Sequence, residues 1–278
     1  AVYTNRDYTP FARRRDTQVA KQVGVPVHFY DDALLLPPGS VVKDNGEPYT
    51  VFTPFKRKWL TLPIEAKVDA PSSEAFVKAE QVGRYRIEGT NKGFQSPFER
   101  VPSLDDLGHP STIAVLAASE QEAAKRLDDF VAKRIYAYSE GRNQLTAISD
   151  DDTYMGSSFL SPYLRFGMLS PRQAYWAAHQ ASEATRKDDY RQSVEAWVSE
   201  LVWREFYMHI LYQFPHVAKG SFRPQYDKLQ WRYAADDLAA WKAGMTGFPV
   251  VDAAMRQLKA MGWMPNRARM IVASFLTK

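Results

Sequence analysis

The beginning of the chain alternates between short apolar runs and a longer charged stretch. Residues 2–3 and 25–30 are apolar runs of strand length, and the arginine-rich residues 8–23 between them are typical of a helix. This order predicts two parallel strands joined by a crossover helix. Because a parallel sheet needs more strands with both faces covered, we expect the sequence to begin inside a larger α/β domain.

The periodicity weakens in the middle of the chain and then becomes helical. Residues 52–59 predict a short helix, whereas residues 63–118 mix Pro, Gly and Ser without a clear period. From Ser119 onward the apolar spacing is that of helices. We therefore predict a partial α/β domain over 1–62, an inter-domain linker over 63–118 and a mostly α-helical domain over 119–278.

Capping signals divide this second half into helices. Ser119 and Glu122 have the spacing of a capping box, and a second box begins at Ser170, with proline at the favoured first helical position. The last predicted helix is apolar and lacks a stop signal, so we expect that its continuation has been lost. Together the signals predict helices over residues 119–140, 188–214, 236–243, 249–261 and 265–278.

The predicted helix over residues 194–212 combines an apolar surface with internal charges. Apolar side chains cover most of its circumference, which is typical of a buried helix. Glu200, Arg204 and Glu205 nevertheless lie in its middle. A buried charge costs several kcal/mol unless it has partners, so these residues need an explanation.

Two interpretations of these charges stay open. Glu200 and Arg204 have the spacing of an ordinary ion pair along a helix. Alternatively, they serve a flat ligand, because Glu200 and Arg204 share a face with Trp197 and a second indole, Trp203, is close in sequence.

A serine-rich segment, GSSFLSPYLRFG over residues 156–167, predicts a short helix that ends at a glycine. Its hydroxyls and free amides suit a phosphate. Serine is also a common helix cap, and that simpler interpretation remains.

The segment GWMPNRARM over residues 262–270 places Pro265 in the first turn of a helix, followed by Arg267 and Arg269. Cations are unfavourable at a helix N-terminus. These guanidinium groups therefore either bind an anion or an acidic side chain, or are simply solvated.

Composition narrows the classes of function. Cysteine is absent and the five histidines are scattered, so we predict no metal site. Neither GxGxxG nor GxxxxGK[ST] occurs, which removes the usual sequence evidence for a nicotinamide enzyme or a P-loop NTPase. Residues 219–278 hold ten Lys/Arg against four Asp/Glu, which fits either a polyanion partner or a solvated surface. No apolar run is long enough to cross a bilayer, so we expect a cytoplasmic protein without membrane contact.

Five segments together resemble the photolyase/cryptochrome flavoproteins, of the class I cyclobutane-dimer type. They are NRDYTPFARRRD, VFTPFKRKW, SSFLSPYLRFGMLSPRQ, WVSELVWREFY and TGFPVVDAAMRQLKAMGWMPNRARMIVASFLTK. The resemblance implies that residues 1–62 belong to a partial α/β antenna-type domain with a parallel sheet. It also implies that residues 119–278 form a mostly α-helical FAD-binding domain, truncated at its C-terminus.

The resemblance also implies roles for individual residues. Those expected to bind FAD are Tyr138, Ser157, Ser158, Leu160, Ser161, Trp197, Glu200, Arg204, Asn266 and Arg269. Those expected to face the DNA lesion are Glu200, Trp203, Asn266, Arg267 and Met270. Glu200 and Asn266 are expected to act in catalysis, with Trp231 as the outermost member of a tryptophan electron chain. An antenna chromophore, folate or deazaflavin, is also implied, but its identity is undetermined.

The implied function is light-driven repair, in which reduced FAD passes an electron to a cyclobutane pyrimidine dimer in UV-damaged DNA. We expect a monomer associated with the nucleoid. One alternative is a cryptochrome-type blue-light receptor, although Asn266 resembles the repair enzymes and plant cryptochromes typically carry Asp there. The other is a flavin-free helical DNA-binding fragment.

Overall fold

The computed structural model describes residues 1–66, 103–108, 116–145 and 156–278. Residues 1–66 and 116–278 form one compact unit, and residues 67–115 form a second. Most of the predicted linker lies outside the described residues, and the domain boundaries given above stay a prediction.

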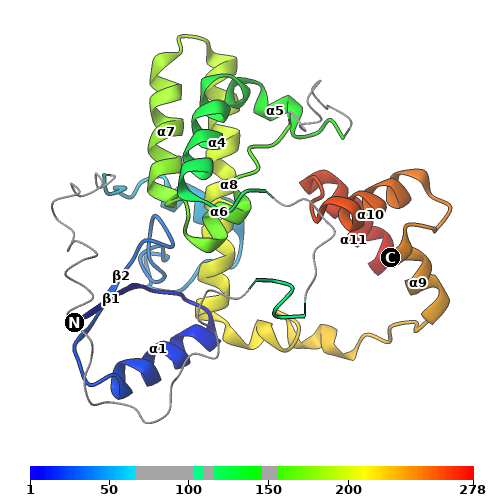
Figure 1. The fold of residues 1–278 in the computed structure, drawn as a ribbon, viewed down its shortest axis with the longest axis horizontal. Helices are drawn as coiled ribbons and strands as arrows, with labels where there is room; N and C mark the ends of the chain where they lie inside the picture. The colour runs from blue at the N-terminus through cyan, green and yellow to red at the C-terminus, as the bar shows by residue number, and fades with distance from the viewer. Residues whose placement is uncertain (67–102, 109–115, 146–155) are drawn as a thin grey trace. The chain divides into compact units, whose positions relative to one another are not determined.

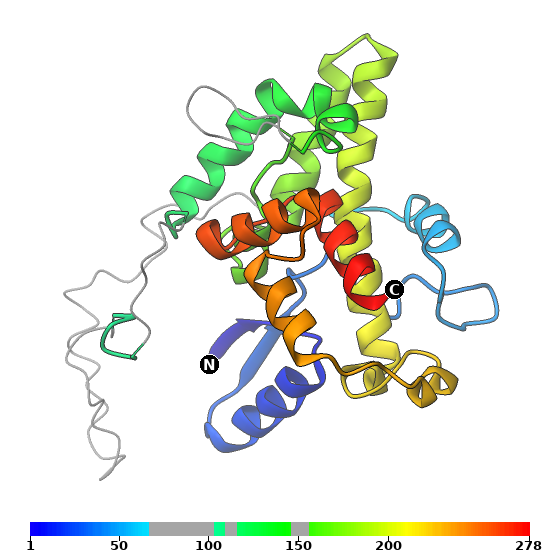
Figure 2. The same ribbon diagram turned by 90° about the vertical axis from the view of Figure 1, so that its right-hand side faces the viewer.

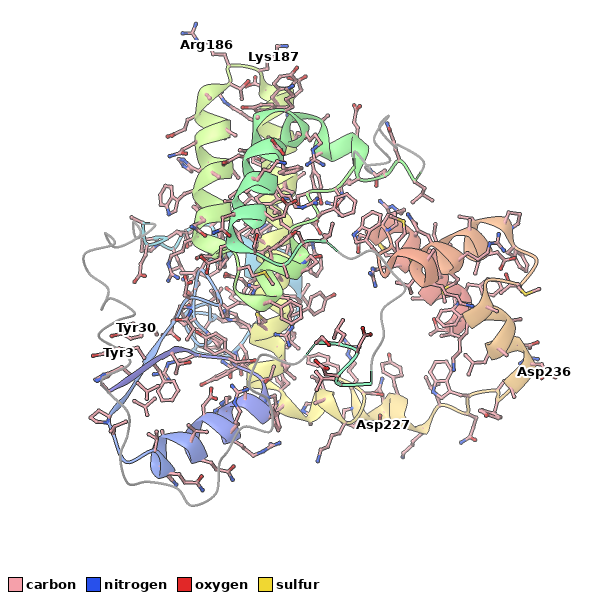
Figure 3. The ribbon with its side chains drawn as sticks, in the orientation of Figure 1. Tyr3, Tyr30, Arg186, Lys187, Asp227 and Asp236 are labelled. Atoms are coloured by element: carbon pink, nitrogen blue, oxygen red, sulfur yellow. The ribbon has the colours of Figure 1, made fainter. Side chains whose placement is uncertain are left out.

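The N-terminal segment folds as the predicted strand–helix–strand unit (Figure 1). Strands β1 (Val2–Asn5) and β2 (Val27–Tyr30) pair in parallel, and α1 (Pro10–Gln22) connects them. Tyr3 and Tyr30 lie on neighbouring strands, with ring centroids 6.3 Å apart (Figure 3). The expected parallel sheet is confirmed.

Helix α2 (Phe52–Trp59) packs the N-terminal part against the helical part. Its side chains Phe55 and Trp59 are each 1% exposed and join Leu35, Val202 and Phe206 in one apolar cluster. Burying an aromatic side chain contributes about 1.5–3 kcal/mol, so this cluster is a major source of stability. The segment before α2 is thereby fixed against the long helix that carries Val202 and Phe206.

The predicted helix over 119–140 is interrupted, which corrects that expectation. Helix α4 (Glu120–Ala132) starts at Ser119 as predicted, then a 3₁₀ turn (Arg134–Ala137) and α5 (Tyr138–Gly141) follow. The break comes at Lys133, where φ is −140°. The Ser193 hydroxyl donates to the Ile135 carbonyl at 2.8 Å and accepts from the Ser139 amide at 3.0 Å, so tertiary hydrogen bonds replace helical ones. The spacing of apolar residues in the sequence does not indicate that tertiary hydrogen bonds replace helical ones here.

Three helices pack side by side around a second apolar cluster, as both ribbon views show (Figures 1 and 2). They are α4, α7 (Pro171–Ala184), which opens with the predicted capping box, and α8 (Asp188–Gln213). The short α6 (Ser161–Phe166) ends at Gly167 in a left-handed conformation, φ 71°. Helix α8 is the longest element described and borders both apolar clusters.

The C-terminal part contains α9 (Ala235–Ala243), α10 (Pro249–Met261) and α11 (Asn266–Thr277). Gly244 and Gly262 end α9 and α10 with φ of 67° and 66°, values that favour glycine. Helices α10 and α11 share a third cluster, and the loop between them contacts the serine-rich segment through the rings of Trp263 and Phe159. None of the helices in the described part of the chain is long and apolar enough to span a membrane.

Candidate flavin site

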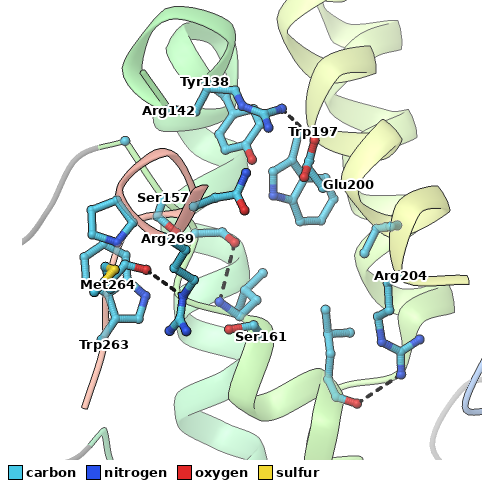
Figure 4. Close-up of a pocket in the computed structure, with 17 residues that line it drawn as sticks. Tyr138, Arg142, Ser157, Ser161, Trp197, Glu200, Arg204, Trp263, Met264 and Arg269 are labelled. Atoms are coloured by element: carbon cyan, nitrogen blue, oxygen red, sulfur yellow. Dashed lines mark hydrogen bonds and ion pairs between the residues drawn. The ribbon is translucent and has the colours of Figure 1, made fainter. Parts of the chain in front are cut away.

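A cavity of about 380 Å³ lies between three stretches that are distant in sequence (Figure 4). Its walls come from α5 and the serine-rich segment through α6, from α8, and from the α10–α11 loop with the start of α11. All ten residues expected to bind FAD line it: Tyr138, Ser157, Ser158, Leu160, Ser161, Trp197, Glu200, Arg204, Asn266 and Arg269.

The α8 wall follows from helical spacing. Trp197, Glu200, Leu201 and Arg204 recur at i, i+3, i+4 and i+7 and lie on the face that borders the cavity. The Trp197 ring is 4% exposed and packs against Phe130, with centroids 5.3 Å apart. The predicted face is thus confirmed, with a fixed indole next to two charged groups.

Glu200 pairs with Arg142, a residue that was not predicted to belong to the site. The Arg142 guanidinium lies 2.6 Å from the Glu200 carboxylate, and the two side chains are 25% and 31% exposed. Arg142 follows Tyr138 by one helical turn, and its guanidinium lies 5.3 Å from the centre of that ring. This one-turn spacing from Tyr138 is the feature of the sequence that could have placed Arg142 in the site. The simple Glu200–Arg204 pair is replaced by this longer-range contact.

Arg204 is held by backbone carbonyls. Its Nη1 donates to the Ala33 carbonyl at 2.6 Å and its Nη2 donates to the Leu164 carbonyl at 3.4 Å. Burial lowers the pKa of Arg204, and the nearby Glu205 carboxyl partly offsets this. A guanidinium has five N–H donors, so both bonds can persist while others reach a ligand.

The serine-rich wall has an unusual backbone. Phe159 adopts φ 55°, and its ring packs against Trp263 at 4.5 Å between centroids. The Ser157 and Ser158 hydroxyls accept from the amides of Phe159 and Leu160 at 3.3 and 3.4 Å. These bonds close local turns before the helix and do not cap α6, whose N-cap Leu160 has no side-chain cap hydrogen bond, so the simple capping interpretation is wrong. Each hydroxyl can still donate to a ligand.

The α11 wall presents Asn266 and Arg269. The Arg269 Nε donates to the Met264 carbonyl at 3.2 Å. Pro265 precedes the helix as its cap, one residue from the predicted start. The cavity residues that were not assigned to FAD from the sequence are Arg142, Gly156, Leu164, Leu201, Trp263, Met264 and Pro265.

Four predicted residues do not line the cavity. The Trp203 ring stacks on Phe52 with centroids 3.5 Å apart, because it projects from a different face of α8 than Trp197. The structure therefore does not place both indoles around one ligand. Arg267 donates to the Asn143 side chain at 2.6 Å. Met270 and Trp231 are 55% and 67% exposed.

The cavity suits an anionic ligand with flat rings. Its lining contains three guanidinium groups and one carboxylate, a formal balance of +2. Hydroxyls and an amide side chain supply hydrogen bonds, and Trp197, Trp263 and Tyr138 supply aromatic surface. The volume lies within the usual range for small-molecule and cofactor sites. A dinucleotide matches this lining, because its pyrophosphate suits the guanidinium groups and hydroxyls and its fused rings suit the aromatic side chains.

Comparisons with known proteins agree with that chemistry. Residues 197–278 match the family model described as the FAD binding domain of DNA photolyase, and residues 1–73 match the DNA photolyase model. The chain belongs to the photolyase/cryptochrome family. The first match begins at Trp197 and therefore includes the α8 and α11 walls of the cavity.

Curated relatives in this family are deoxyribodipyrimidine photo-lyases. Over all of this chain, identity is 37% to the Synechococcus enzyme and 36% to the Escherichia coli enzyme, with 55% and 54% of those proteins covered. The chain thus spans about half the length of the curated relatives it matches.

Solved structures agree with the fold. A class III photolyase from Agrobacterium tumefaciens matches with a TM-score of 0.73 and 30% identity, over 99% of this chain and 54% of that one. A Synechocystis cryptochrome matches with a TM-score of 0.69 at 23% identity, over 98% and 55%, and supports the fold alone. An α/β start followed by a mostly helical domain is therefore confirmed, while membership of class I stays a prediction.

Proposed function

We propose that this chain binds FAD and carries the central part of a light-driven repair site for cyclobutane pyrimidine dimers, the activity of a deoxyribodipyrimidine photolyase. The observation that carries the proposal is that all ten residues assigned to FAD by sequence line one cavity. The second alternative, a flavin-free DNA-binding fragment, gives no reason for this convergence.

The side chains suggest a division of labour. Arg204 and Arg269 supply positive charge for the pyrophosphate, with hydrogen bonds from the serine hydroxyls. Trp197 offers a buried ring face beside the flavin rings. Arg204, Arg269 and the serine hydroxyls would hold FAD, which when bound and reduced would supply the light-excited electron for splitting the dimer and take it back afterwards.

Glu200 is the group proposed to hydrogen-bond the dimer, with Asn266 beside it. The carboxylate is already paired with Arg142, so a lesion must share or displace that guanidinium. Photolyases take their target nucleotide out of the duplex. Trp203, Arg267 and Met270 stay predicted lesion contacts, and Trp231, which is exposed, stays the predicted outer electron carrier.

The remaining parts of the proposal follow from this role. The excess of basic residues over 219–278 supports salt-dependent binding of DNA phosphates. Action on UV-damaged chromosomal DNA in the cytoplasm, associated with the nucleoid and as a monomer, is the setting that we propose. An antenna chromophore, folate or deazaflavin, is part of the proposal without an assigned site.

Two measurements test the function in order. First, the purified 278-residue chain is mixed with FAD and desalted, and co-eluting absorbance between 350 and 500 nm is recorded. Second, the reduced complex is illuminated with an oligonucleotide carrying one thymine dimer, with a dark control. Flavin retention with light-dependent repair supports the proposal. Flavin retention without repair favours the cryptochrome-type alternative, and absence of flavin refutes the site.

A further inference from the structure

Three of the four residues 33–36, which precede α2, are bound by three side chains of α8. Arg204 donates to the Ala33 carbonyl at 2.6 Å, and His209 Nε2 lies 3.1 Å from the Leu36 carbonyl. Between them, the Glu205 carboxylate accepts from the Leu35 amide and, at 3.3 Å, from the Leu36 amide. We call residues 33–36 the α8-bound segment.

Glu205 is an unusual residue for this position. It is 1% exposed and also accepts from the Trp59 indole nitrogen at 2.7 Å. A buried carboxylate is costly, and it is retained only when hydrogen bonds replace its lost water. Three N–H donors from two separate segments do so here. An apolar side chain would fill the same volume but would leave those donors without an acceptor.

Glu205 and Arg204 act on the same short segment from adjacent positions. Successive residues of a helix project in directions about 100° apart, so Arg204 borders the cavity while Glu205 points into the core. The backbone connects the Ala33 carbonyl to the Leu35 and Leu36 amides within three residues. Movement of the α8-bound segment therefore moves the acceptor that orients Arg204.

We propose that Glu205 is a positioning residue of the cavity: its carboxyl group fixes the α8-bound segment, and the Ala33 carbonyl of that segment orients Arg204 toward the ligand. Glu205 itself does not touch the cavity. The ligand named here rests on the proposed function, but the positioning contact is independent of it.

A double-mutant cycle between Glu205→Gln and Arg204→Ala tests the proposal. The Kd for FAD is measured by fluorescence quenching for the wild type, both single variants and the double variant. We expect Glu205→Gln to raise Kd about tenfold when Arg204 is present and less than about twofold when it is absent. Equal factors in both backgrounds would show that Glu205 acts on general stability and would overturn the proposal.

Trp59→Phe is the matched control. It removes one hydrogen bond to Glu205 but leaves the Leu35 and Leu36 amides in place. We expect a lower melting temperature with Kd within about twofold of the wild type. A tenfold loss in this control would also overturn the proposal. If Glu205→Gln does not fold, Glu205→Asp enters the cycle in its place.

A readout without flavin separates this proposal from the proposed function. The side-chain ¹⁵N–¹H signals of Arg204 are recorded by NMR for the wild type and Glu205→Gln without ligand. We expect the variant to lose the exchange protection of the guanidinium. Unchanged signals would refute the positioning role even if FAD binds, whereas lost protection supports it even if FAD does not bind.

Discussion

The buried Glu205 carboxyl makes the stability of this protein depend on pH. Burial raises its pKa to about 7, although the N–H donors of Trp59, Leu35 and Leu36 and the charge of Arg204 act in the other direction. In the unfolded chain the same group has its ordinary pKa of 4.5. The folded protein therefore holds this proton over a pH range in which the unfolded chain releases it.

The size and sign of the effect follow from these two values. A pKa difference of about 2.5 at about 1.4 kcal/mol per unit corresponds to about 3–4 kcal/mol. This contribution is fully present below pH 4.5 and is lost as the pH rises through 7. Above that pH the loss is complete and the dependence on this group ends.

The perturbation is Glu205→Gln, which removes the titration. Unfolding free energies of both proteins are measured by urea denaturation from pH 4.5 to 8.5, and the wild-type minus variant difference is plotted. We expect this difference to fall by about 3 kcal/mol across the range. A flat difference would refute the reasoning.

Neighbouring groups do not change this expectation. Burial lowers the pKa of His209, so the free energy of unfolding decreases as the pH drops below the ordinary histidine pKa of 6.5. Both proteins keep His209, so this effect cancels in the difference. Burial and the Asp31 hydrogen bond raise the pKa of Tyr8 beyond the range measured. Arg204 stays protonated throughout.

Three further predictions concern the cavity and the helix ends. Arg204→Ala should weaken FAD binding at least about tenfold in equilibrium dialysis, because charged hydrogen bonds contribute about 1.5–3 kcal/mol; full retention would contradict its phosphate role. Glu200→Ala should lower the light-driven repair yield more than it lowers DNA affinity; equal losses would indicate a structural role. Gly244→Ala should cost more than the about 1–2 kcal/mol of a left-handed alanine, because its Cβ would lie 2.7 Å from the Asp252 carbonyl. Gly262→Ala, with φ 66° and no atom within 4 Å, is the control, and equal losses in urea denaturation would contradict the packing argument.

The sequence predicted elements whose signals are local. The capping box at Ser170 and the long helix α8 are where the pattern placed them. The face of α8 that carries Trp197, Glu200 and Arg204 also followed from spacing alone. Local periodicity and capping chemistry suffice for such features.

Contacts between distant segments could not be predicted in this way. Glu205 was recognisable as a charge in a buried helix, but its donors on Leu35 and Trp59 are 170 and 146 positions away. The break at Lys133 depends on Ser193, and the place of Trp203 depends on Phe52. None of these pairs leaves a periodic signal in one sequence.

In the described part of the chain, two walls of the cavity, α5–α6 and α8, already pack on each other, whereas the α10–α11 wall meets them through contacts such as Phe159–Trp263 and Arg267–Asn143. This difference affects how the protein is produced. A ligand that touches all three binds the folded chain and not the unfolded one, so free ligand at 100 times Kd adds about 2.7 kcal/mol of stability by mass action. Cells depleted of riboflavin during expression should therefore yield less folded protein and more proteolysis, and vitamin supplementation should reverse both.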